Sequence, residues 1–227
     1  MPKQQQDPAE ELQKTLELVI DVLLRAQSHL ALGRGTGEML SSEPAILNAA
    51  PTFWTLTIVA HFDSALLLAF KLFDTQPRAV TIPQLLVLCE KNPTLFKSRS
   101  TEQVIASVTI ARNQIAGIRD SLEAVNARRN RVIAHLESTA VRDPQKLEAE
   151  TAVTFSDLNK VFAFAGNMLN EVSVALWDIT PMFDAIGIDD FQTVGQLIVE
   201  AKCEQIRKYE AEFHVPWDGP RPKNCPQ

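Results

Sequence analysis

Apolar residues recur at spacings of three and four along most of the chain, which is the period of amphipathic helices. The expected helices span roughly residues 8–32, 52–73, 100–137, 156–177 and 189–209, with a short one between the capping residue Thr81 and Asn92. No period-two strand pattern recurs, and no internal repeat is evident. The pattern therefore predicts an all-α fold, an antiparallel bundle of about five to six helices that forms a single domain over residues 1–227.

The segments outside these helices are rich in residues that end helices. Gly33 suits the position just after the first helix, so residues 33–50 are expected to form an exposed connection. Their glycines lack the preceding strand and the Gly-Lys-Ser/Thr of a phosphate-binding loop. Residues 1–8 are expected to be a flexible N-terminus. Residues 215–227 contain four prolines and are expected to be a non-helical tail that is extended or disordered.

The stretch 52–73 is apolar nearly all round, which predicts a helix at the centre of the bundle. It contains His61, Asp63 and Lys71, and a membrane-spanning helix carries few ionisable side chains. We therefore expect a buried helix of a soluble protein with no membrane partner. His61 and Asp63 point to different sides of this helix, so we interpret them as polar filling of the core.

Composition narrows the range of functions. The chain is 45% apolar and 22% charged, which is typical of globular proteins, and its net charge is −6. An anionic ligand must therefore meet a local basic patch. Cys89, Cys203 and Cys225 form no Cys-x-x-Cys pair, which favours a reducing, cytoplasmic setting. The four histidines lie far apart and no familiar catalytic motif occurs, so we expect neither a metal nor a cofactor.

The stretch 100–137 contains an apolar seam that a cation interrupts. The seam consists of Val104, Val108, Ala111, Ile115, Ile118, Leu122 and Val125. Its register continues through positions 129, 132 and 136, and Arg129 occupies the first of these. An unpaired buried guanidinium costs several kcal/mol. Arg129 must therefore pair with a carboxylate such as Glu123 or Asp120, reach solvent, or face a polar cleft.

The neighbours of Arg129 favour a cleft. Five arginines and two acidic residues lie between Arg112 and Arg131, and paired guanidinium groups can hold phosphates. His135 titrates near neutrality and can move protons. In a straight helix Arg128 and Arg131 share the face of His135, whereas Arg129 lies about 120° away. Either the helix distorts before His135 or a second chain completes the cleft.

These residues resemble a known family. Arg129-Asn130 followed by His135 matches the Arg-x(4–6)-His signature of the HEPN superfamily (higher eukaryotes and prokaryotes nucleotide-binding domains). Ala50-Pro51-x-Phe53-Trp54, Leu72-Phe73-Asp74 and the run from Arg129 to Leu136 are similar to its abortive-infection-U branch, of the AbiU2 type. The resemblance extends over about residues 10–210.

The resemblance implies a helical dimer in which motif residues of both protomers line one cleft. It implies a metal-independent endoribonuclease in phage defence or a toxin-like role, with RNA, a second copy and an antitoxin or other neutralising partner. His135 would be the acid–base, Arg129 would stabilise the transition state, and Asn130 would orient the phosphate or His135. Local charge alone assigns Arg128 and Arg131 to phosphate contact.

Two alternatives stay open at this point. One is a non-catalytic HEPN module that binds RNA, a nucleotide or a protein. The other is purely structural, with Arg129 in an ion pair, His135 as a satisfied residue at a helix C-terminus, and Arg128 and Arg131 on a solvated face.

Overall fold

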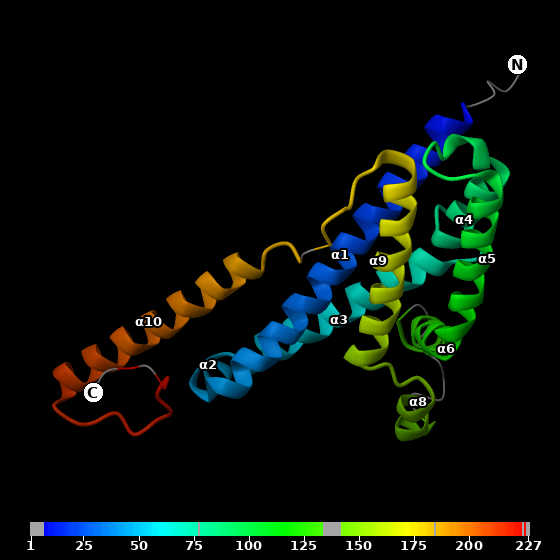
Figure 1. Ribbon diagram of the computed structural model, residues 1–227. Helices are drawn as coiled ribbons and strands as arrows, with labels where there is room; N and C mark the ends of the chain where they lie inside the picture. Colours follow the sequence, from blue (N-terminus) through cyan, green and yellow to red (C-terminus); the bar gives the residue numbers. More distant parts are fainter. Residues whose placement is uncertain (1–6, 77, 134–141, 184, 224, 226–227) are drawn as a thin grey trace, which may run out of the picture. The chain divides into compact units, whose positions relative to one another are not determined.

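The computed structural model describes residues 7–76, 78–133, 142–183, 185–223 and 225. Over these residues the chain is helical and contains no strand (Figure 1), which confirms the all-α prediction. The elements are α1 (Pro8–Ser42), α2 (Pro44–Ala49), α3 (Pro51–Phe73), α4 (Ile82–Lys91), the 3₁₀ turn η1 (Pro93–Leu95), α5 (Thr101–Gly117), α6 (Arg119–Arg128), the π-helical turn η2 (Arg129–Ile133), α8 (Pro144–Glu150), α9 (Phe155–Trp177) and α10 (Ile188–Phe213). The helices are more numerous than expected because a break divides the expected helix over residues 100–137 into α5 and α6, and because α2 and α8 lie in segments where no helix was expected.

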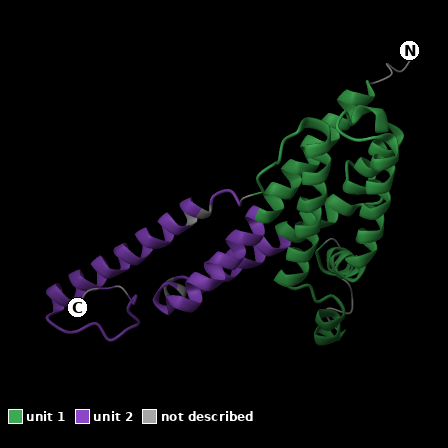
Figure 2. Ribbon diagram, viewed as in Figure 1, with its two compact units in different colours: residues 1–27, 64–184 green, residues 28–63, 185–227 purple. Residues whose placement is uncertain are grey.

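The chain divides into two compact units (Figure 2). Unit 1 comprises residues 1–27 and 64–184, and unit 2 comprises residues 28–63 and 185–227. Helices α1 and α3 each contribute to both units. Whether the chain folds as one domain stays a prediction.

Unit 1 is built around a leucine-rich core. Its fully buried large side chains are Leu12, Leu16, Leu23, Leu66, Leu72, Ile82, Leu85, Leu158, Phe162 and Leu169. Burial of each such side chain contributes roughly 1.5–3 kcal/mol. Helices α5 and α6 run antiparallel to α9, because the Ser98 hydroxyl donates to the Ala175 carbonyl near one end and Ser121 donates to Asp157 near the other.

Polar caps fix where the helices of unit 1 begin. Ser100 and Gln103 form the capping box that starts α5, and the Thr81 hydroxyl accepts from the Gln84 amide at the start of α4. Each cap satisfies amide groups that have no partner within the helix. These starts agree with the sequence predictions, and α9 begins one residue before the expected position.

The expected connection at residues 33–50 is wrong, because α1 continues to Ser42 and α2 follows it. Packing within unit 2 explains the difference. A Cβ placed on Gly33 would lie 3.2 Å from the Cβ of His61, so glycine permits a close approach of α1 and α3. Leu40 packs in a buried cluster with Ile46 and Trp54. These contacts outweigh the low helix propensity of glycine.

The same helices bring two histidines together in unit 2. Nδ1 of His29 and Nδ1 of His61 lie 2.9 Å apart, so one imidazole donates and the other accepts. Burial lowers the pKa of His61, which favours the neutral form that this hydrogen bond needs.

The prediction that α3 is central holds for its second half and is wrong for its first. Ala65, Leu66, Ala69 and Leu72 are buried, whereas the exposed fractions of Phe53, Leu56 and Val59 are 59%, 62% and 48%. In the described part of the chain, α3 is the one helix that is long and apolar enough to cross a membrane. Core helices of soluble proteins pass the same test of length and composition.

The helix expected over residues 100–137 is interrupted. Helix α5 ends at Gly117, Ile118 leaves helical geometry at φ −108° and ψ 12°, and α6 then gives way to η2. The seam remains buried at Val104, Val108, Ala111 and Val125, while Ile115, Ile118 and Leu122 are half-buried.

Candidate functional site

The arginine-rich motif lies where α6 changes from α-helical to π-helical hydrogen bonding. The π-helical turn η2 spans Arg129–Ile133. Its i→i+5 hydrogen bonds place more residues in each turn than an α-helix does, and such turns occur often at functional sites. The turn is a helix distortion before position 135, one of the two arrangements that the spacing allowed. His135 itself lies outside the described residues.

Arg129 packs against an aromatic ring and binds its neighbour. Its guanidinium carbon lies 4.5 Å from the centroid of the Phe70 ring of α3, and Nη1 donates to Oδ1 of Asn130 at 2.6 Å. The Arg129 side chain is half-buried and that of Asn130 is exposed. A guanidinium over a ring face gains about 0.5–2 kcal/mol, depending on solvation.

The expected ion-pair alternative for Arg129 is not found among the described residues, where no carboxylate lies within ion-pair distance of its guanidinium. Glu123, the nearest candidate in sequence, pairs instead with Arg119 at 2.7 Å. The positive charge of Arg129 is therefore not neutralised by any described side chain. A cation held in this way can attract an anionic ligand.

Arg128 has an unused hydrogen-bond donor. Its side chain is half-buried, and its Nε is inaccessible to solvent and has no hydrogen-bond partner among the described residues. A buried donor without an acceptor costs about 1–3 kcal/mol. The donor lies next in sequence to Arg129, so two guanidinium groups occur at the junction of α6 and η2.

Arg131 connects η2 to the following helix. Its Nη2 lies 3.0 Å from Oε2 of Glu150 on α8, and Lys146 approaches the same carboxylate at 3.9 Å. The side chains of Arg131 and Glu150 are 30% and 43% exposed. Ion pairs as accessible as this one contribute little stability, so a phosphate can compete with Glu150 for Arg131.

The remaining arginines of the basic stretch are paired with carboxylates. Arg112 holds Glu90 through two hydrogen bonds of 3.0 and 2.7 Å. These bonds lower the pKa of Glu90 and raise that of Arg112. Arg119 pairs with Glu123. Within this stretch, as far as the structure describes it, the positive charge that carboxylates do not neutralise is therefore concentrated on Arg128 and Arg129.

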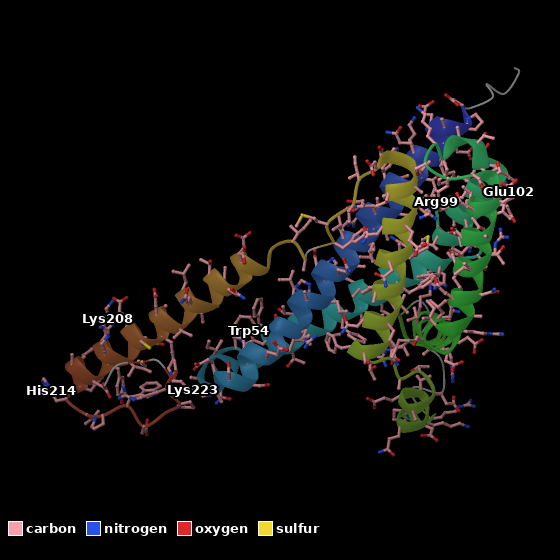
Figure 3. All side chains as sticks on the ribbon, in the orientation of Figure 1. Trp54, Arg99, Glu102, Lys208, His214 and Lys223 are labelled. Atoms are coloured by element: carbon pink, nitrogen blue, oxygen red, sulfur yellow. The ribbon has the colours of Figure 1, made fainter. Side chains whose placement is uncertain are left out.

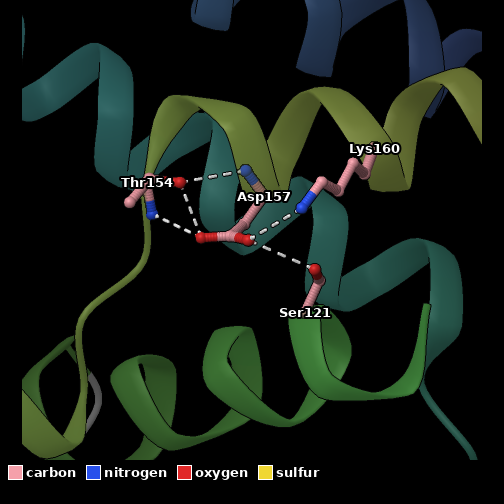
Figure 4. A network of polar contacts seen from close by, with 4 residues as sticks. All are labelled: Ser121, Thr154, Asp157 and Lys160. Carbon is pink, nitrogen blue, oxygen red and sulfur yellow. Dashed lines mark hydrogen bonds and ion pairs between the residues drawn. The ribbon is translucent and has the colours of Figure 1, made fainter.

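A polar network holds α6 against α9 close to the motif (Figure 4). The Asp157 carboxylate accepts from the backbone amide and hydroxyl of Thr154, at 3.0 and 2.6 Å, and from Ser121 at 3.3 Å. Lys160 lies 4.0 Å from the carboxylate. The hydroxyl of Thr154, followed by its backbone amide, lowers the pKa of Asp157. The network ties the start of α9 to α6, two turns before η2.

Sequence reasoning missed two residues of this arrangement. Thr154-Phe155-Ser156-Asp157 has the Thr-x-x-Asp spacing of a capping box, and that signal identifies Asp157 as a cap. No pattern in the sequence connects Phe70 with Arg129, because a contact between residues so distant along the chain depends on the tertiary fold.

Comparison with known proteins identifies the family. No curated protein and no solved structure matches the chain. A family model, HEPN_AbiU2, described as AbiU2, matches residues 10–194, which confirms the resemblance drawn from the motif. Since this match covers well over half of the sequence, the chain belongs to the AbiU2 family of HEPN domains.

Proposed function

We propose that this protein is a metal-independent endoribonuclease of the HEPN type. The chain belongs to a family of HEPN domains that is related to abortive infection. The observation that carries the proposal is the environment of Arg129, whose guanidinium lies over Phe70 and binds Asn130, with no carboxylate beside it among the described residues. A cation held in a fixed position and not neutralised suits a developing phosphoryl charge.

In the proposed reaction, the 2′-hydroxyl of RNA attacks the adjacent phosphate. His135 removes the hydroxyl proton as general base and supplies a proton to the departing 5′-oxygen as general acid. Arg129 stabilises the extra negative charge of the pentacoordinate phosphate. The products are a 2′,3′-cyclic phosphate and a 5′-hydroxyl end.

The neighbouring polar residues then have distinct roles. Oδ1 of Asn130 accepts from Arg129, which leaves the Asn130 amide nitrogen to donate to a phosphate oxygen or to orient His135. Arg128, whose side chain is half-buried, contributes a second guanidinium that no described carboxylate neutralises, and Arg131 exchanges Glu150 for a phosphate. These contacts position the backbone of the RNA.

The proposed setting is the cytoplasm, where the enzyme serves phage defence by abortive infection or acts as a toxin controlled by an antitoxin or other neutralising partner. The active form is proposed to be a homodimer with a composite cleft. Light scattering tests this part, and a strict monomer at micromolar concentration that still cleaves RNA would contradict it.

A cleavage assay tests the reaction directly. Single-stranded RNA is incubated with the protein in excess chelator, and we expect fragments that end in a cyclic phosphate. The His135→Ala variant should lose cleavage while its circular dichroism is unchanged. A substrate with 2′-deoxyribose at the cut site should resist cleavage. Cleavage by His135→Ala equal to that of the wild type would remove His135 from the mechanism.

The second candidate function is a non-catalytic module that binds RNA, a nucleotide or a protein. It is favoured by the same two guanidinium groups, which bind phosphate with or without chemistry. If the wild type and His135→Ala bind RNA equally and neither yields product, this function replaces the nuclease.

A further inference from the structure

A cavity in unit 1 is enclosed by α4, α5 and α9, and no residue of the arginine-rich motif lines it. It holds about 370 Å³ of space, part of which opens to solvent. Its interior is apolar, because each of the three helices contributes buried side chains, among them Leu86 and Cys89 of α4, Val108 and Ala111 of α5, and Met168 and Ala175 of α9. Cavities of this size and character usually hold the apolar part of a small molecule.

One cationic side chain lines the cavity. Arg99 is half-buried, and its Nη1 donates to the Ser107 hydroxyl at 2.8 Å, which holds the guanidinium in place. Among the residues that the structure describes, no carboxylate lies within ion-pair distance of Arg99. Glu102, labelled with Arg99 in Figure 3, is exposed in the first turn of α5 and does not line the cavity. The positive charge of Arg99 is therefore available to a ligand.

One anionic side chain lines the same cavity. Glu171 of α9 is exposed, and in the described part of the chain it has no ion-pair partner. It also lines an adjoining hollow, together with the exposed amides of Gln114 and Asn167. Arg99 and Glu171 do not pair with each other, so a ligand between them can pair with both.

The two charges restrict the kind of molecule that fits. A monocarboxylate would pair with Arg99 but would also meet the negative charge of Glu171. An amine would pair with Glu171 but would also meet the positive charge of Arg99. A neutral apolar molecule would use neither charge. A small zwitterion with one apolar group pairs with both side chains and fills the apolar interior.

We propose that this cavity binds a free α-amino acid with a large apolar side chain, such as leucine. The side chain of the ligand occupies the interior, its carboxylate pairs with Arg99 and its ammonium group pairs with Glu171. These are three attachments around one carbon atom, so the site distinguishes the two enantiomers. The bound ligand links the segment before α5 to α9 and stabilises unit 1.

Isothermal titration calorimetry on the full chain tests the ligand class. The compounds are L-leucine, D-leucine, 4-methylpentanoate, which lacks the ammonium group, and 3-methylbutylamine, which lacks the carboxylate. We expect one leucine enantiomer to bind saturably at one site per chain. The affinities of the other enantiomer and of both analogues should be at least about threefold lower, because each leaves one attachment unmade.

Two pairs of matched variants test the charged side chains. Arg99→Gln and Glu171→Gln should each lower the affinity for the preferred enantiomer at least about threefold. Lys97→Gln and Glu102→Gln remove the same charges from exposed positions that do not line the cavity. These two controls should bind leucine as the wild type does.

A third kind of variant tests the apolar interior. Ala111 is 7% exposed and lines the cavity, so Ala111→Leu places a larger side chain in the space that the ligand needs. Leucine binding should be lost while the circular dichroism is unchanged. The proposal is overturned if neither enantiomer binds at about 10 mM, if the four compounds bind alike, if each charge variant behaves like its control, or if folded Ala111→Leu binds leucine as the wild type does.

Discussion

The environment of the Arg129 guanidinium differs from each of those that the sequence predicted. The seam of apolar positions predicted that a cation at this position needs a special environment, and three environments were expected for it: a carboxylate, solvent or a polar cleft. The structure shows a further one, the face of Phe70, together with a hydrogen bond to Asn130. The ring holds the guanidinium in place without cancelling its charge, which a carboxylate would do.

We predict that the contact between Arg129 and Phe70 is measurable as a coupling energy. In a double-mutant cycle of Phe70→Leu with Arg129→Gln, urea unfolding should show a coupling of about 0.5–1 kcal/mol, the value of a half-exposed cation–π contact. Phe73→Leu is the matched control, because Phe73 is half-buried one turn later and packs on Phe164 at 6.1 Å. If the two cycles gave equal coupling energies, the Phe70 ring would contribute only apolar packing and no cation–π contact with Arg129.

Asp157 also allows a prediction at the residue scale. Its pKa is lowered in the folded state by the hydrogen bonds from Thr154, and the unfolded value is about 3.9. The stability that ionised Asp157 contributes is therefore present above about pH 4 and is lost as the pH falls through the folded pKa.

The expected result is a pH-dependent difference between Asp157→Asn and the wild type. At pH 7 the variant should be less stable by about 1 kcal/mol, the usual value of a helix cap, and the difference should shrink towards pH 2. Urea midpoints at both pH values measure it. Asp120→Asn removes an exposed carboxylate of α6 and is the control for the loss of one negative charge. If the difference in stability between Asp157→Asn and the wild type were the same at pH 7 and pH 2, ionised Asp157 would not stabilise the fold.

At the scale of elements, helix starts were predicted well and helix continuations poorly. The starts of α4 and α5 depend on local capping side chains at Thr81 and Ser100, and a local signal is visible in the sequence. The continuation of α1 beyond Gly33 depends on contact with α3, a tertiary effect that overrides propensity. The break at Ile118 directly follows Gly117, the last residue of α5.

Two of the three glycines of α1, Gly33 and Gly37, should respond differently to alanine. Gly37 has open space around a new Cβ, so Gly37→Ala should stabilise the protein by about 0.5–1 kcal/mol by favouring the helix. At Gly33 the new Cβ would lie 3.2 Å from the Cβ of His61. There the clash offsets the gain, and the free energy of unfolding should be equal to or below that of the wild type. Urea unfolding followed by circular dichroism measures both, and equal gains would contradict the close approach of α1 and α3.

At the scale of the whole molecule, the distribution of charge matters more than its sum. The chain carries a net −6, and the count between Arg112 and Arg131 predicts a basic patch inside it. The structure shows that Glu90, Glu123 and Glu150 pair with three of these five arginines. The sequence identifies the motif residues. It does not show which arginines are neutralised by carboxylates, because Glu90 and Glu150 lie on other helices.

This division predicts which arginines make RNA binding salt-dependent. In a His135→Ala background, which prevents cleavage, the slope of log affinity against log salt should be weaker by about 0.7 in Arg128→Gln, the value for one phosphate contact with a single strand. Arg119→Gln removes the same charge from the same stretch, but Arg119 already pairs with Glu123 and displaces no counterion from RNA. Its slope should therefore equal that of the background. If both substitutions weaken the slope equally, diffuse positive charge holds the RNA. The arginines at the junction of α6 and η2 then do not determine where the RNA binds.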